Sequence, residues 1–187
     1  MHSAWLAILF AFFILSLLKT ALTDARFGMV PDCYQGMILL SGSIYKYFCS
    51  KWQNAAICLI VFQPTTEHNL PYYILSAFCV AAGLILPGLF CEPIGGADIK
   101  FAFSLGYIFG LNVAIQIILL GSLLFILHFL LIYIKRHIIN RRNKQLIRQH
   151  SMLVRLPFIP YLAAATFVRL SPSLVLLFDQ VRHNLYF

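Results

Sequence analysis

Gly95-Gly96-Ala97-Asp98-Ile99-Lys100 places a glycine pair, an acid and a base directly before a long apolar stretch. A carboxylate beside hydrocarbon is costly, so an acid at such a boundary is by default a candidate for a functional site. Asp98 also stands where a helix would begin, and an Asp there commonly caps the helix by accepting backbone N–H hydrogen bonds. Taken alone, the position favours capping. A second acid, Asp24, changes that balance.

The composition is that of an integral membrane protein. Of the 187 residues, 61% are hydrophobic and only 11% are charged, which is far too apolar for an ordinary soluble domain. The apolar runs lack the alternation of outer-membrane strands, so the spanning elements should be helices. We expect one all-α domain over residues 1–187, a polytopic membrane bundle of about six transmembrane helices.

The charge distribution points to membrane orientation. The net charge is +8, and half of the Lys and Arg lie between residues 135 and 155, where there is no acid. Such a loop is typical of the cytoplasmic side of a membrane, so we expect no nucleic-acid partner. The residues concerned are Lys135, Arg136, Arg141, Arg142, Lys144, Arg148 and Arg155.

The five cysteines form no CxxC pair and no group with histidines at metal-ligand spacing. We therefore expect no metal site and no cofactor. Cys49 and Cys58 are candidates for a disulfide outside the membrane, but unpaired cysteines are the favoured interpretation.

The first half of the chain predicts three membrane crossings, over residues 4–22, 33–49 and 71–91. The first has the length needed to cross hydrocarbon, and it lacks the basic start and clear cleavage site of a signal peptide. Gly28 and Pro31 should end its helix. Residues 50–70 should form an external loop with an interfacial or re-entrant helix.

The second half predicts three further crossings. The apolar stretch from Phe101 to Ile134 is too long for one crossing, so we expect two helices with a turn near residues 110–112. Gly106 and Gly110 should let another backbone approach closely. His128 is interpreted as a buried, hydrogen-bonded structural histidine. Residues 156–177 form the sixth crossing, with Arg169 near its outer end.

Counting crossings back from a cytoplasmic 135–155 loop brings Asp98 and Asp24 to one membrane face, with both chain ends external. Two facing carboxylates cannot both ionise cheaply, so they share a proton and can divide acid and base roles around one water. This is the chemistry of aspartic proteolysis. The alternative is a six-helix transporter or a non-enzymatic assembly subunit that uses the two acids for ion coupling or packing.

Four elements then carry a family resemblance. In chain order they are Asp24 followed by Val30-Pro31-Asp32, the Gly95–Lys100 hexapeptide, the Gly106 and Gly110 pair, and Pro157-Phe158-Ile159-Pro160. Together, over residues 20–165, they resemble the prepilin peptidases, or type IV leader peptidases, which are membrane aspartyl proteases with a GxGD signature. Ala97 and Ile159 stand where that family has glycine. The cytosolic insertion with paired CxxC motifs, which longer members use in methylation, has no counterpart here.

The resemblance implies a short, cleavage-only enzyme of the bacterial inner membrane, with its active site on the cytoplasmic side. Its substrates would be membrane-inserted prepilins or pseudopilins of pilus or secretion systems, cut after a Gly that follows a basic leader. N-methyltransferase activity is not expected. The implied catalytic residues are Asp24 and Asp98, and the implied supporting residues are Gly95, Gly96, Lys100 and Pro31.

Four expectations about the site follow. Asp24 and Asp98 should lie at one depth and face a common cleft. The Gly95-Gly96 pair should serve as a hinge, and Lys100 should lie close enough to bias the ionisation of the acids. Four of the six acids, namely Asp24, Asp32, Glu92 and Asp98, should orient the basic leader.

Overall fold

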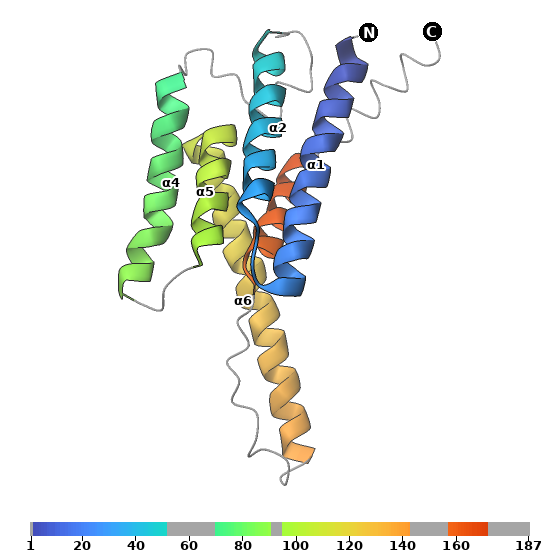
Figure 1. Ribbon diagram of the computed structural model, residues 1–187. Coiled ribbons are helices and arrows are strands. Elements are labelled where there is room, and N and C mark those ends of the chain that lie inside the picture. Colours follow the sequence, from blue (N-terminus) through green and yellow to red (C-terminus); the bar gives the residue numbers. More distant parts are fainter. Residues whose placement is uncertain (1, 52–69, 91–94, 143–156, 172–187) are drawn as a thin grey trace.

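The computed structural model describes residues 2–51, 70–90, 95–142 and 157–171, and the regular structure in these ranges is helical throughout. This confirms the all-α prediction for the described part of the chain. The helices are α1 (His2–Phe27), α2 (Asp32–Lys51), α4 (Leu70–Phe90), α5 (Gly96–Phe109), α6 (Leu111–Arg142) and a last helix over Ile159–Ser171 (Figure 1).

The turn between α1 and α2 forms where the sequence predicts it. Gly28 has a φ of 64°, a conformation that side chains with a Cβ rarely adopt. Its N–H donates to the Asp24 carbonyl at 2.8 Å, which closes the last turn of α1. Pro31 then precedes α2, and its carbonyl accepts the Tyr34 N–H at 3.0 Å.

The long apolar stretch is divided at Gly110, as predicted. Gly110 has a φ of 77°, and its N–H donates to the Gly106 carbonyl at 3.0 Å. The Gly110 carbonyl accepts the Ala114 N–H at 3.1 Å, so α6 starts almost immediately after α5 ends. The two helices run in opposite directions (Figure 1).

The helices form a bundle in which α1 packs antiparallel to α2, α4 packs antiparallel to α5, and α2 packs on α5 in the same direction (Figure 1). In Figure 1, the C-terminal ends of α1 and α4 lie at the same end of the bundle as the N-terminal ends of α2 and α5. The last helix begins at that end too. We call this the acid end, because α1 and α5 carry Asp24 and Asp98 there.

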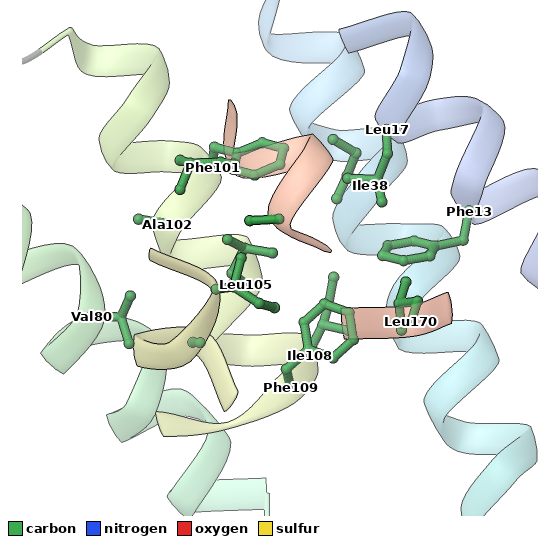
Figure 2. Close-up of a cluster of buried hydrophobic side chains, with 14 of the residues drawn as sticks. Phe13, Leu17, Ile38, Val80, Phe101, Ala102, Leu105, Ile108, Phe109 and Leu170 are labelled. Carbon is green, nitrogen blue, oxygen red and sulfur yellow. The ribbon is translucent and has the colours of Figure 1, made fainter. Parts of the chain in front are cut away.

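A single cluster of buried apolar side chains joins these helices. Figure 2 shows Phe13 and Leu17 of α1, Ile38 of α2, Leu105 of α5 and Leu170 of the last helix around it. Each contributes an apolar side chain that is at most 2% exposed. The cluster extends to Ile159 at the acid end and fixes the helices that carry the acids.

Gly106 brings α5 close to α4, as its spacing predicts. A Cβ at this position would lie 2.8 Å from both the Ala77 Cα and the Ser76 carbonyl oxygen. These are backbone atoms, which cannot move aside as a flexible side chain can. The contact is the close backbone approach that small residues permit between packed helices.

Among the described residues, two helical segments are long and apolar enough to cross a membrane, Ala7–Phe27 and Leu111–Lys135. The second lies in α6, whose C-terminal part extends past the other helices in Figure 1. Leu127, Phe129 and Leu131 of this segment are exposed. Exposed apolar side chains on such a helix fit a lipid environment. The other crossings of the six-helix arrangement remain predictions.

The structure corrects the prediction for His128. This residue is exposed, and its ring lies 5.7 Å from the Tyr161 ring. It is not a buried core histidine because α6 has begun to leave the bundle at this point. Cys33 and Cys79 are free and exposed. The external loop, the pairing of Cys49 with Cys58, and the basic loop after Arg142 lie outside the described residues.

Candidate active site

Asp24 is a buried acid one turn before the end of α1. Its side chain is 5% exposed, and the backbone N–H of Ile159 donates a hydrogen bond to its carboxylate. Ile159 is the first residue of the last helix, where backbone N–H groups have no partner within the helix and the dipole favours an anion. The proline-containing segment singled out in the sequence thus supplies a contact to Asp24. The second carboxylate oxygen, Oδ2, is buried without a hydrogen-bond partner.

Asp98 lies in the first turn of α5 and does not cap it. The N-cap residue is Gly95, which makes no side-chain capping bond, and the Asp98 N–H donates to the Gly95 carbonyl at 3.0 Å. The capping interpretation of Asp98 is therefore wrong. Its carboxylate folds back toward Gly95, where an added Cβ would lie 3.0 Å from Asp98 Oδ2. Gly95 leaves the space that this carboxylate occupies.

The fold brings the two acids, far apart in the sequence, within electrostatic range. Burial and then the negative charge of Asp24 raise the pKa of Asp98 to about 6. A carboxyl of this kind holds its proton close to neutral pH while its neighbour is ionised. This is the condition under which two carboxyls can take opposite roles in proton transfer.

Lys100 has a different partner from the one expected. Its ammonium pairs with Asp32, the acid that follows the α1–α2 turn, and both side chains are more than half exposed. Such an exposed pair contributes little to stability. Pro31 shapes the start of α2, and Gly96 is the exposed first residue of α5. The assignment of catalytic and supporting roles to these residues remains a prediction.

Gln35 is a site residue that the sequence analysis missed. It lies on α2, is 4% exposed, and its Nε2 donates to the carbonyl of Ala97 at 3.4 Å. Ala97 immediately precedes Asp98, so this bond links α2 to the backbone that carries the second acid. Gln35 Oε1 is buried without a partner. Its place in the sequence could have indicated it. Asp24 precedes the α1–α2 connection by about one helical turn, and Gln35 follows that connection by about the same length.

The cationic side chains of Lys46 and Arg169 lie in the part of the bundle opposite the acid end. Lys46 Nζ lies over the Tyr73 ring and donates to the Tyr107 carbonyl at 3.1 Å, near the C-terminal end of α5. Arg169 and Gln116 line a cavity of about 250 Å³ between α6 and the last helix, and Arg169 Nε is buried without a hydrogen-bond partner. Arg169 was expected to reach the outer interface.

The acid end therefore has one carboxyl whose pKa is raised to about 6 beside a second carboxyl, Asp24, which is a condition for dividing acid and base roles. Neither a protein-family model, nor a curated protein, nor a solved structure matches this chain.

Proposed function

We propose that this protein is an aspartic endopeptidase of the prepilin-peptidase kind. One observation carries the proposal. Burial and the nearby negative charge of Asp24 raise the pKa of Asp98 to about 6. A lone capping acid needs no such partner. The order of motifs along the chain supports the same conclusion.

In the proposed reaction, ionised Asp24 takes a proton from a water molecule, whose oxygen bonds to the carbonyl carbon of the scissile peptide. Protonated Asp98 gives its proton to the carbonyl oxygen, so a neutral tetrahedral intermediate forms. Collapse of the intermediate breaks the C–N bond. Asp24 then donates its new proton to the leaving nitrogen, and Asp98 recovers its proton from the former carbonyl oxygen.

The proposed substrate is a membrane-inserted prepilin or pseudopilin with a basic leader. Gly at the cleaved bond suits this site, because Gly favours unwinding at a helix end and leaves room for two carboxyls. The exposed Asp32 adds a negative charge near the acid end, partly balanced by Lys100. The proposed setting is the bacterial inner membrane, with the acid end on the cytoplasmic side. The reaction uses neither a metal nor a cofactor.

A transporter is the second candidate, and the cavity at Arg169 and Gln116 favours it. A transport path needs polar groups inside the membrane. The cationic side chain of Arg169 and the amide of Gln116 line this cavity between apolar helices. On that reading the two acids would couple ion movement. The two functions differ in a direct way, because only the peptidase shortens a prepilin.

The test is co-expression with a prepilin, followed by mass measurement of the pilin. We expect removal of the leader by the unaltered protein, with no added methyl group. Asp24→Asn and Asp98→Asn should each lower cleavage by at least about a thousandfold, because each removes one half of the proton-sharing pair. Asp32→Asn is the matched control and should retain most activity, since its carboxylate is exposed and paired with Lys100.

Equal amounts of each variant in the membrane fraction would show that the loss is chemical. Near-normal processing by either Asp24→Asn or Asp98→Asn would refute the peptidase assignment. A loss in Asp32→Asn as large as in Asp24→Asn would mean that a different acid carries the reaction.

A further inference from the structure

Two buried oxygen atoms at the acid end have no hydrogen-bond partner, Asp24 Oδ2 and Gln35 Oε1. Both are acceptors, since the Gln35 amide uses its Nε2 for the Ala97 carbonyl. A buried acceptor left unpaired costs about 1–3 kcal/mol, so each one calls for an explanation. At a reactive site the usual explanation is a ligand or a water that supplies the missing donor.

The two residues that carry these oxygens lie on packed neighbouring helices. Asp24 and Gln35 are each about one turn from the tight turn that joins α1 to α2, and the two helices are antiparallel and packed. They therefore lie at similar depth on neighbouring helices. Gln35 also contacts Ala97, the residue before Asp98, so it lies next to both acid-bearing segments.

The orientation of the Gln35 amide follows from its partner. If the amide were turned over, its oxygen would face the Ala97 carbonyl oxygen, and two acceptors would oppose each other. Nε2 must therefore face Ala97. Oε1 is left to accept a hydrogen bond from a group that approaches the acids.

We infer that Gln35 is a positioning residue that, together with Asp24, orients the attacking water. This rests on the proposed peptidase function. A water donates two hydrogen bonds, which matches two free acceptor atoms, whereas a peptide N–H donates one. One hydrogen lies on Asp24 Oδ2 and is transferred to it in the reaction. The other lies on Gln35 Oε1 and stays with the hydroxyl that bonds to the carbonyl carbon.

If Gln35 had a purely structural role, we would expect its amide oxygen as well as its amide nitrogen to be hydrogen-bonded within the protein. Ser41, a buried polar residue on the same helix, directs its hydroxyl to the carbonyls of Met37 and Ile38 at 2.7 and 3.2 Å. Its hydrogen-bonding capacity is used within α2. Gln35 instead sends its donor to another helix and keeps a free acceptor near the acids.

The experiment uses the full chain in detergent and a peptide with a basic leader, a Gly at the cleavage site and an apolar helix. Gln35→Met keeps the size of the side chain but removes the amide, and it should lower kcat about tenfold to hundredfold with KM within about twofold. Gln35→Glu keeps an oxygen acceptor and should recover part of the rate. Its added carboxyl should move the alkaline limb of the pH profile to higher pH, by making Asp98 harder to ionise.

Ser41→Ala is the control and should leave kcat and the pH profile unchanged. The inference is overturned if Gln35→Met lowers only the amount or melting temperature of the folded protein and leaves kcat per folded molecule intact. It is also overturned if Gln35→Glu is no more active than Gln35→Met and has an unshifted profile. Failure of the unaltered protein to cleave any such peptide would instead refute the proposed function, and the inference with it.

Discussion

The polar groups near the two ends of α2 differ in whether their hydrogen bonds are formed within the protein. At one end, Lys46 has its ammonium over the Tyr73 ring and bonded to the Tyr107 carbonyl. At the acid end, Asp24 and Gln35 each keep a buried oxygen without a partner. A cation near the C-terminal end of a helix complements the dipole and the last carbonyls, so the first arrangement stabilises the fold.

The difference separates structural polar residues from candidate functional ones. A polar group that only supports the fold has its hydrogen bonds met inside the protein, because unmet ones cost stability. A group that handles substrate must keep one free. On this comparison, changes at the acid end should alter the chemistry, and changes at Lys46 should alter stability.

Without any substitution at the acids or at Gln35, the largest expected effect is the pH dependence of cleavage. Asp98 must be protonated to act as the acid, and burial together with Asp24 raises its pKa to about 6. The protonated fraction, and with it kcat/KM, should fall about fiftyfold between pH 6 and pH 8. A constant rate across that interval, measured with the same peptide, would remove Asp98 from the acid role.

The raised pKa of Asp98 also makes the stability of the folded protein depend on pH. The direction of this dependence is opposite to that of an ordinary surface acid. The pKa of Asp98 in the folded protein exceeds the 3.8 of an unperturbed Asp, so the folded state binds the proton more tightly than the unfolded chain does. Its contribution to stability is therefore greatest below pH 3.8 and declines as the pH rises to about 6.

Substitutions in the Gly95-Gly96 pair should change kcat less. They show whether the pair provides space for the Asp98 carboxylate or flexibility of the backbone. Gly95→Ala places a Cβ 3.0 Å from Asp98 Oδ2, so the carboxylate must shift by a few tenths of an ångström. We expect kcat to fall about threefold to tenfold. A Cβ at Gly96 meets nothing within 4 Å, so Gly96→Ala should be close to neutral.

Measuring both variants under identical conditions provides the comparison. If Gly96→Ala loses as much activity as Gly95→Ala, the pair acts as a hinge, as the sequence analysis expected, and not through the space beside Asp98. Equal, unimpaired rates for both would show that the carboxylate tolerates displacement.

The smallest expected effect on catalysis belongs to Lys46→Met. This change removes the donor to the Tyr107 carbonyl and should lower the free energy of unfolding by about 1 kcal/mol, while kcat stays within about twofold. Lys19→Met is the control, because Lys19 is exposed and lies 4.9 Å from the Tyr34 ring. Melting curves and cleavage rates on one preparation test this, and a tenfold loss of kcat in Lys46→Met would break the distinction between the two ends.

The sequence by itself determined the local features of this protein. The turn at Gly28, the break at Gly110 and the helical character of the described residues follow from backbone preferences and from apolar runs that need no distant partner. The identity of the two candidate acids could also be predicted, because charged residues are rare in so apolar a chain.

Only the tertiary structure decided which polar groups meet. The pairing of Lys100 with Asp32, the bond from Gln35 to Ala97 and the contact of Ile159 with Asp24 join segments far apart in the chain. The exposure of His128 likewise depends on where α6 leaves its neighbours. Such contacts are set by how helices pack and how deeply each residue lies. A linear pattern records the periodicity of each helix but not its rotation or offset against the others.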